Sequence, residues 1–331
     1  MTLPPCLNQA QATEEMNRLA KAHIPFLFII DYTMTNCYVI PLNEVNPEFI
    51  AYDFNGHSNR FVKDSETPPA IDFQKIPICK KQYQQGFEHV IHGLKRGDSF
   101  LMNYTAATPI KTNLSLLDIF KHTRAKYKLY VKDRFCCFSP EIFVQTKDNT
   151  IHTFPMKGTI DASLPHAQQT ILQDPKEAAE HATIVDLMRN DLSMVANQVQ
   201  VKAYRYIDTL QTNQGGLLQV SSHIQGTLTE VAQQNIGTTI FRLLPAGSIS
   251  GAPKAKTCQI IAQAEAHARG FYTGVAGIFD GQNIDSGVLI RFIEQDEKGT
   301  HFFHSGGGIT AKSNLDNEYD ELIQKVYLPI Y

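Results

Sequence analysis

The sequence lacks the features that mark several large classes of protein. Its 331 residues contain no run of Lys and Arg, and the formal net charge is −3, which argues against a general grip on nucleic acid or on a membrane surface. The apolar run at residues 24–30 follows scattered charges and stops at Asp31, so it matches neither a secretory signal nor a membrane span. We therefore expect a cytoplasmic protein with a small substrate.

Metal-binding cysteine motifs and repeats are also missing. The six cysteines include the adjacent pair Cys136 and Cys137, and the other four are scattered, so they form neither a CxxC pair nor a zinc spacing. We expect reduced cysteines that serve in packing. The sequence contains no internal repeat or low-complexity tract, and its length suits about two average domains or one large one.

Short apolar segments separated by turn residues predict an α+β fold. Because the connections are short, we expect large, mostly antiparallel sheets covered by helices. Residues 1–80 are predicted to form a reduced β-rich portion packed on the core, and residues 81–331 to form the catalytic domain. The predicted strands are residues 26–30, 38–42, 49–54, 100–103, 127–131, 134–138, 142–145, 151–156, 199–206, 217–228, 272–279, 288–294 and 301–304. The predicted helices are a segment before Gly97 and residues 114–125, 174–191, 231–244, 254–266 and 313–326.

The helix predicted at residues 174–191 has a well-marked start and two acids in an unusual place. Asp174 is suited to cap the helix, Pro175 fits its first position, and Glu177 stands where a capping-box partner belongs. At about 100° per residue, Glu177 and Glu180 fall within the apolar face of the helix. Carboxylates in that position need partners.

A second predicted helix, residues 313–326, repeats this arrangement. Glu318, Glu321 and Lys325 form one stripe beside its apolar stripe. Two carboxylates about 4 Å apart repel each other by about 4 kcal/mol at an effective dielectric of about 20, so apposed acids need protons or a cation. We hypothesise a shared Mg²⁺, which prefers oxygen ligands and keeps some waters for an anionic substrate. The alternative is two helices that carry ordinary solvated charge.

Two positions near the C-terminus suit an anionic ligand. Arg291 interrupts a predicted strand that is apolar on both faces, so its buried guanidinium needs either a ligand carboxylate or an internal salt bridge. Gly306, Gly307 and Gly308 follow a predicted strand, and their N–H groups can approach an anion without interference from Cβ atoms. The alternative for the glycines is a simple turn.

Lys157 and Glu141 are candidates for chemistry on a substrate. Lys157 stands at a strand end where Pro155 and Gly158 constrain the backbone, and it is either a surface lysine or a positioned amine nucleophile. Glu141 begins a strand and is a candidate general acid if an apolar pocket raises its pKa. The small residues of the loop 245–254 either admit a ligand to a helix N-terminus or make a tight connection.

Taken in this order, these stretches resemble the chorismate-utilising enzymes. That family comprises anthranilate synthase component I, aminodeoxychorismate synthase component I, and the isochorismate and salicylate synthases. The motifs that carry the resemblance are KEAAEHATIVDLMRND, PAGSISGAPK, and GGGIT followed by S, E, E and K, and the match runs over about residues 86–326. The resemblance implies the anthranilate synthase component I fold and a Mg²⁺-dependent enzyme that acts on chorismate, a small dicarboxylate.

The resemblance also implies roles for the candidate residues. Glu180 and Glu321 look like direct Mg²⁺ ligands, and Glu177 and Glu318 look like neighbours that bind through water. Glu141 looks like the acid that protonates the departing hydroxyl at ring carbon 4. The groups that would hold the substrate's carboxylates and enolpyruvyl arm are Lys325, Arg291, Tyr272, Ser250 and the backbone of Gly306, Gly307 and Gly308.

Lys157 indicates the branch of the family. Anthranilate synthases carry alanine in that motif, whereas aminodeoxychorismate synthases carry lysine, which is implicated as a nucleophile at ring carbon 2. The resemblance thus implies amination of chorismate to 4-amino-4-deoxychorismate, on the route to p-aminobenzoate and folate. Leu101 occupies the place where water-using relatives have a lysine base, which counts against isochorismate or salicylate synthesis. The alternatives are anthranilate synthesis and a non-catalytic chorismate-binding subunit.

The sequence departs from the family pattern in three respects. Relatives usually have a histidine at the position of Gln219, and glutamine cannot deliver a proton, so weight shifts to Glu141 as the acid. His223 is offset from that position. The N-terminal part shows no convincing tryptophan pocket, so feedback inhibition by tryptophan is not expected. No glutaminase nucleophile elbow is found, and a separate glutamine amidotransferase is implied as the source of ammonia.

Overall fold

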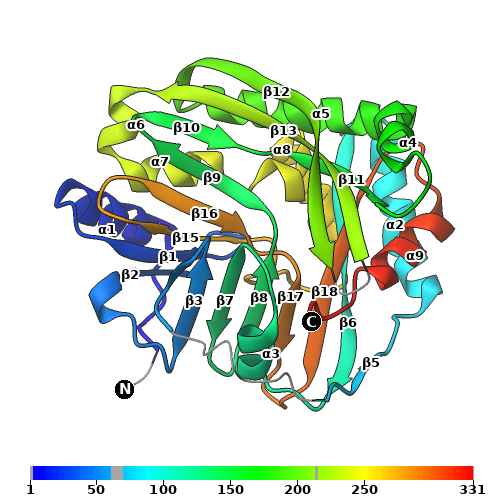
Figure 1. Cartoon of the computed structure of the whole chain (residues 1–331), viewed down its shortest axis with the longest axis horizontal. Coiled ribbons are helices and arrows are strands. Elements are labelled where there is room, and N and C mark those ends of the chain that lie inside the picture. The colour runs from blue at the N-terminus through cyan, green and yellow to red at the C-terminus, as the bar shows by residue number, and fades with distance from the viewer. Residues whose placement is uncertain (1–2, 61–69, 213–214, 331) are drawn as a thin grey trace.

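Two large β-sheets with helices on their outer faces make up the fold (Figure 1). The computed structural model describes residues 3–60, 70–212 and 215–330. Each sheet has nine strands, and every strand pairing between described residues is antiparallel. The predicted α+β class with large antiparallel sheets is therefore confirmed. Among these residues, the helices are too short or too polar to cross a membrane.

Sheet A has the spatial order β11-β13-β10-β9-β16-β15-β1-β2, and β12 pairs with β13. It combines strands from the beginning, middle and end of the chain. Its strands are β1 (Phe26–Ile30), β2 (Cys37–Pro41), β9 (Ile142–Lys147), β10 (Thr150–Thr153), β11 (Met156–Asp161), β12 (Ala196–Thr212), β13 (Gly215–Leu228), β15 (Val275–Phe279) and β16 (Ile284–Val288).

Sheet B has the spatial order β14-β6-β18-β17-β8-β7-β3-β4, and β5 pairs with β6. The two long strands β6 and β18 pair with each other on the side of the sheet that carries the candidate site. Its strands are β3 (Ile50–Phe54), β4 (His57–Ser58), β5 (Phe73–Lys75), β6 (Leu101–Thr112), β7 (Tyr127–Val131), β8 (Phe135–Ser139), β14 (Gly251–Ala252), β17 (Phe292–Gln295) and β18 (His301–Ile309).

The helices cover the outer faces of the two sheets. Helices α1, α5 and α7 share a core with sheet A, α3 packs on sheet B, and α2, α8 and α9 pack beside β6 and β18. The helices are α1 (Gln9–Lys21), α2 (Lys80–Lys95), α3 (Leu116–His122), α4 (Ala167–Gln173), α5 (Pro175–Ser193), α6 (Glu230–Gln234), α7 (Ile236–Leu243), α8 (Lys254–Ala264) and α9 (Leu315–Gln324), with short 3₁₀ turns η1 (Leu42–Glu44) and η2 (Gly247–Ile249).

Strand β1 shows how the layers are held together. Its five residues are all buried, because successive side chains point to opposite faces of sheet A. Phe26 and Phe28 enter the core under the helices of sheet A, and Leu27 and Ile29 enter the core between the two sheets. Each such side chain contributes about 1.5–3 kcal/mol through burial. A continuous apolar segment therefore becomes a strand with two buried faces.

Two connections cross from one sheet to the other at the same place. The segment with Glu141 leads from β8 in sheet B to β9 in sheet A, and the segment ending at Arg291 leads from β16 in sheet A to β17 in sheet B. Backbone hydrogen bonds tie the crossings together, from Val288 N to Glu141 O at 3.1 Å and from Phe138 N to Arg291 O at 3.0 Å. Glu141 and Arg291 are thus neighbours where the sheets meet.

Two predicted strands differ from the structure near this junction. The strand predicted at residues 288–294 is broken, because residues 289–291 cross between the sheets and Arg291 has a φ of +53°, which an extended strand does not allow. Arg291 is therefore not an interior residue of one strand. The glycines at 306–308, predicted to follow a strand, lie inside β18 and pair with β6.

The helix predicted at residues 231–244 is also different, since it divides into α6 and α7 at Asn235, which has non-helical dihedrals. The domain boundary at residue 80 stays a prediction. The strands before it are spread over the whole fold, with β1 and β2 in sheet A and β3, β4 and β5 in sheet B.

Arg269 and Glu265 form a buried ion pair beside β6. Their side chains are 2% and 3% exposed, and Arg269 Nη2 lies 2.6 Å from Glu265 Oε1. Arg269 also donates to the carbonyls of Ile249 and Asn103, at 2.8 and 2.7 Å. Thr105 N donates to Glu265 Oε1 at 2.9 Å. The pair therefore connects the segment after α8 to the loop before it and to β6.

We expect the Glu265→Gln variant to lose about 3 to 5 kcal/mol of stability, because it leaves the buried Arg269 guanidinium without a counter-charge. Urea denaturation measures this loss in the free energy of unfolding. Glu15→Gln is the control, since Glu15 and Arg18 pair on the surface with side chains 30% and 59% exposed, and its unfolding midpoint should stay unchanged. Equal midpoints for the two variants would contradict the assigned role of the buried pair.

Candidate active site

Lys157 lies on β11 and forms an ion pair with Glu180 of α5. The Lys157 Nζ is 2.9 Å from Glu180 Oε2, with side chains 23% and 6% exposed. Helix α5 starts as predicted, because Asp174 accepts a hydrogen bond from Glu177 N at 2.9 Å. The Glu177 side chain lies against Gly158, where a Cβ atom would be only 2.7 Å from Glu177 Oε2. Glycine at position 158 thus lets α5 bring both acids to β11.

The acids of α9 lie against a glycine of β18, as Glu177 lies against a glycine of β11. A Cβ atom at Gly307 would lie 3.5 Å from Glu318 Oε2, 3.6 Å from Glu321 Oε1 and 3.9 Å from Lys325 Nζ. Lys325 Nζ lies 2.7 Å from Glu321 Oε1 and donates to the Gly306 carbonyl at 2.8 Å. Glu180 and Glu318 are buried, as expected, whereas the Glu321 side chain is 49% exposed.

The two charged groups meet on the glycine segment of β18. A Cβ atom at Gly308 would lie 3.4 Å from Lys157 Nζ and 3.1 Å from Leu101 Cδ1. Burial by itself would lower the pKa of Lys157, but the carboxylates of Glu180, Glu177 and Glu321 outweigh it and hold that pKa above its ordinary value. One ammonium group therefore feels acids from both helices.

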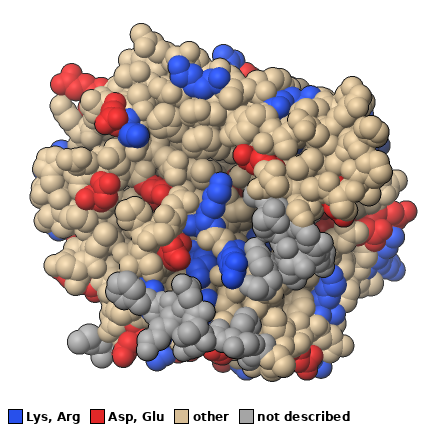
Figure 2. Space-filling model, in the orientation of Figure 1, with Lys and Arg blue, Asp and Glu red and all other residues tan. Residues whose placement is uncertain are grey.

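Cations balance the acids in this space. Burial lowers the pKa of Lys325; Glu321 raises it, while the charges of Arg291 and Lys157 act with the burial. Lys325 is therefore close enough to both Lys157 and Arg291 to be repelled by them. Figure 2 shows Lys and Arg side chains gathered in a hollow near the centre of the viewed face. A ligand with several carboxylates would relieve this repulsion.

Arg291 carries an unsatisfied donor. Its Nε is buried and has no hydrogen-bond partner among the described residues, and its guanidinium lies 5.7 Å from the centre of the Tyr327 ring. A planar guanidinium binds a carboxylate with two parallel hydrogen bonds. Of the two readings of the sequence, the orphaned Nε favours a ligand carboxylate over an internal salt bridge.

Glu141 is partly buried next to Arg291 and receives a hydrogen bond from Ser248. Burial raises the pKa of Glu141, while the Ser248 hydroxyl and the Arg291 charge act in the opposite direction. Tyr272 is 3% exposed, and burial raises its pKa against the charges of Arg269 and Arg291. The predicted acid thus keeps its proton to a higher pH than an exposed glutamate does.

Ser250 is fully buried, and its hydroxyl donates to the Ala246 carbonyl at 2.8 Å, which stabilises its own loop. Its contact with a substrate stays a prediction. Ser248, two residues earlier, is the serine that reaches Glu141, and nothing in the spacing of PAGSISGAPK distinguished the two.

Gln219 lies on β13 opposite Thr159 of β11, two residues from Lys157. His223 is directed elsewhere, since its Nε2 lies 3.0 Å from His152 Nδ1 and its ring stacks on Phe154 at 4.7 Å. It lines a separate cavity of about 490 Å³. His223 therefore does not replace the missing histidine.

The four glutamates of α5 and α9 are ligands of the type that a hard divalent cation prefers. All four donors are carboxylates, and those of Glu180, Glu177 and Glu321 together attract the positive charge of Lys157. Over residues 3–60, 70–212 and 215–330, no three His, Cys, Asp or Glu side chains are already grouped at metal-ligand spacing. Oxygen ligands that close only partly around an ion leave places for water and substrate, as Mg²⁺ prefers.

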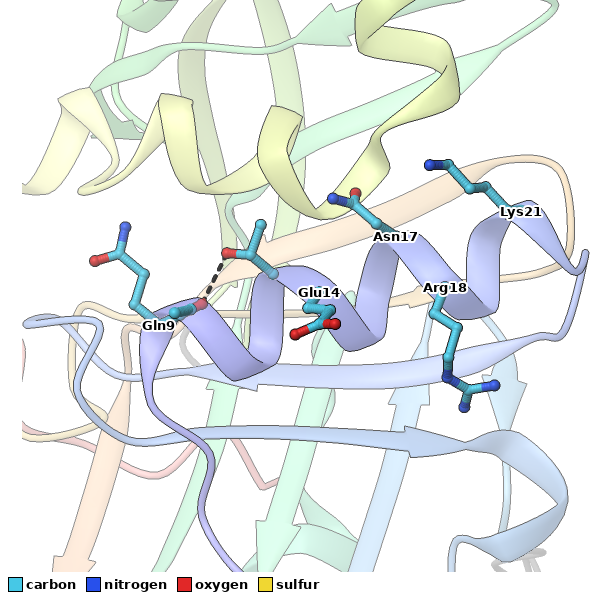
Figure 3. A pocket seen from close by; sticks show the side chains of 7 residues that line it. Gln9, Glu14, Asn17, Arg18 and Lys21 are labelled. Atoms are coloured by element: carbon cyan, nitrogen blue, oxygen red, sulfur yellow. Dashed lines mark hydrogen bonds between the residues drawn. The ribbon is translucent and has the colours of Figure 1, made fainter.

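A further cavity of about 840 Å³ lies along α1 and is lined by residues of that helix alone (Figure 3). The labelled Glu14, Arg18 and Lys21 point away from the helix in different directions, and none of the candidate site residues lines this cavity. It is an open helix surface, remote in sequence and structure from the charged groups described above.

Comparisons with known proteins agree with the geometry. The sequence pattern of the chorismate binding enzymes matches residues 27–330. An "uncharacterized PabA-like protein" of Haemophilus influenzae is 52% identical over 318 residues, which cover 96% of either chain. Aminodeoxychorismate synthase component 1 of Bacillus subtilis is 27% identical over 264 residues, covering 76% of this chain and 55% of that protein.

The solved structure of anthranilate synthase component I from Streptococcus pneumoniae superposes with a TM-score of 0.66 and 26% identity, covering 79% of this chain and 60% of that one. The predicted anthranilate synthase component I fold is thereby confirmed. With a family match that spans nearly all of its described residues, this chain belongs to the chorismate-binding enzymes.

Proposed function

We propose that this chain aminates chorismate at ring carbon 4 to give 4-amino-4-deoxychorismate. The observation that carries the proposal is the position of Lys157, whose Nζ lies 2.9 Å from Glu180 Oε2 and 3.4 Å from the Cβ position of Gly308. An amine is therefore held where the candidate metal ligands meet the candidate substrate floor. A surface lysine would extend into solvent instead.

Leu101 supports ammonia over water as the nucleophile. Its side chain is 5% exposed and shares the space above Gly308 with Lys157 Nζ. A leucine cannot take a proton from water, whereas ammonia carries its own nucleophilic lone pair. The wall of the site therefore lacks a base at this position that could deprotonate water for attack on chorismate.

In the proposed reaction Lys157 and Glu141 act at different ring carbons. The Lys157 ammonium first gives a proton to water, and the resulting neutral amine forms a bond to carbon 2. Both ring double bonds then shift, and the carbon 4 hydroxyl leaves as water with the proton of Glu141. Ammonia then bonds to carbon 4, the bond from carbon 2 to Nζ breaks, and the extra proton on the new amine returns to Glu141. The net change exchanges hydroxyl for amine and releases water.

The remaining groups hold the substrate. We assign a substrate carboxylate to Arg291 because its buried Nε has no partner among the described residues. Lys325 already lies over β18, where it donates to the Gly306 carbonyl at 2.8 Å. Tyr272 lies within the electrostatic influence of both Arg291 and Glu141, which suits a contact with the enolpyruvyl arm. The missing Cβ atom at Gly308 allows a flat ring to approach the strand.

We further propose that Glu180 and Glu321 bind Mg²⁺ and that Glu177 and Glu318 contact it through water. When bound, the ion would offer a positive centre to a substrate carboxylate. The support is that the α5 acids lie at β11 and the α9 acids at β18, and that the charges of Glu180, Glu177 and Glu321 all act on Lys157. A separate glutamine amidotransferase is proposed to supply the ammonia, for p-aminobenzoate and folate synthesis.

Purified protein given chorismate, ammonium and Mg²⁺ should form 4-amino-4-deoxychorismate, with p-aminobenzoate appearing only after a lyase is added. Liquid chromatography with mass spectrometry identifies the product. Fluorescent anthranilate without a lyase would identify an anthranilate synthase instead. Isochorismate formed in the absence of ammonium would contradict the role given to Leu101.

The Lys157→Ala variant should aminate chorismate more than about 100-fold more slowly, because it lacks the attacking amine. Chorismate binding, measured by calorimetry, should persist. Lys132→Ala is the control, since Lys132 lies over the Phe49 ring, 5.3 Å from its centre, and is not part of the site. Amination by Lys157→Ala at the rate of the unaltered protein would remove this lysine from the mechanism.

The Glu180→Gln variant should bind Mg²⁺ at least about 10-fold more weakly in the presence of chorismate, because a carboxylate ligand becomes a neutral amide. Calorimetry without ammonium measures this affinity. Asp186→Asn is the matched control on the same helix, since Asp186 pairs with Arg189 at the surface, 2.6 Å away. Equal Mg²⁺ affinities for the two variants would argue against a metal site at Glu180.

A further inference from the structure

No described residue forms a hydrogen bond with the side chain of Asn103, which lies on β6. Its backbone is fully used, since its N–H donates to Ser250 O at 2.9 Å and its carbonyl accepts from Arg269 at 2.7 Å. Its Oδ1, however, is buried and has no hydrogen-bond partner in the described part of the chain. A buried amide oxygen without a partner costs free energy, and proteins rarely keep one without a reason. A bound ligand would supply that partner.

The side chain of Asn103 faces the strand segment that also lies under Lys157. Asn103 Oδ1 is 3.1 Å from the Cβ position of Gly306, and Lys157 Nζ is 3.4 Å from that of Gly308. Two residues apart on β18, these glycines point to the same face, and their separation is about 6.6 Å. The Cβ position of Gly306 is also 2.6 Å from Thr105 Cγ2, so a six-membered ring would lie over Gly308, beneath Lys157, with the Asn103 carboxamide at its edge.

Asn103 is also coupled to the element that positions the acid. The carbonyl that accepts its N–H belongs to Ser250, and Ser248 of the same loop donates to Glu141. The carboxamide is thus connected to both groups of the proposed reaction: the Lys157 amine, which attacks carbon 2, and the Glu141 acid, which acts at carbon 4. After the hydroxyl has left, the hydrogen-bond donor that arrives at carbon 4 is ammonia.

We propose that the Asn103 carboxamide oxygen accepts a hydrogen bond from the incoming ammonia and directs its lone pair toward ring carbon 4. This inference rests on the proposed function and names a residue that selects the nucleophile. A neutral carboxamide orients ammonia without protonating it, and it cannot act as a base toward water. Leu101 and Asn103 lie on the same face of β6. Leu101 cannot act as a base there, and Asn103 provides a hydrogen-bond acceptor.

The test is the Asn103→Leu variant, which keeps the branching at Cγ and the backbone bonds but removes the acceptor. We expect the KM for ammonium, at fixed pH, to rise about 5- to 10-fold, while the KM for chorismate and the kcat at saturating ammonium stay unchanged. Loss of a merely structural contact would move both KM values or the melting temperature. If the leucine variant does not fold, Asn103→Ala allows the same comparison.

Thr108→Val is the matched control. Thr108 lies on the same strand, is fully buried, and also has a side-chain oxygen without a described partner, but it faces Phe303 rather than the glycines. Both of its KM values should equal those of the unaltered protein. An unchanged KM for ammonium in Asn103→Leu, or an equal rise in both KM values, overturns the assignment to Asn103 alone. If the unaltered protein yields no aminated product, the proposed function falls, and this assignment falls with it.

Discussion

Two backbone hydrogen bonds at the junction of the sheets determine where the site forms. Because Val288 N binds Glu141 O and Phe138 N binds Arg291 O, the two crossing segments cannot move apart without breaking the pairing of both sheets. The candidate acid and the candidate carboxylate-binding guanidinium are thereby placed by main-chain atoms. Their relative position does not depend on the rotamers of long side chains, which lose entropy when they are fixed. A site at such a junction is pre-organised for a ligand.

The charges around this junction are balanced in pairs. Lys157 of β11 pairs with Glu180 of α5, and Lys325, which caps the C-terminal end of α9, pairs with Glu321 of that helix. Isolated charges in such a partly buried space would be expensive, and each pair lowers that cost. A dicarboxylate substrate together with a divalent cation would bring both signs of charge into the site. The binding of one would therefore favour the binding of the other through ordinary electrostatics.

Much of the site was predictable from the sequence, and the reasons are local. The start of α5 follows from Asp174 and Pro175, which set the capping bond and the first turn, and helical periodicity then places Glu177 and Glu180 on one side. The break at Arg291 was not predictable, because its apolar neighbours suit one continuous strand as well as a crossing between two sheets. The contact of Ser248 with Glu141 depends on the turn η2, which the composition of the loop does not specify.

By itself, the amino-acid sequence determined which segments become helices and antiparallel strands, and which motifs relate the chain to chorismate-binding enzymes. Capping, side-chain periodicity and motif order act over a few residues, so they can be read along the chain. Only the tertiary structure decided that Lys157 rests over Gly308, and that Asn103 keeps an oxygen without a described partner beside Gly306. Those positions result from the pairing of β6 with β18 and from the approach of α5 to β11. Such contacts between distant segments depend on how whole layers pack, which local patterns do not contain.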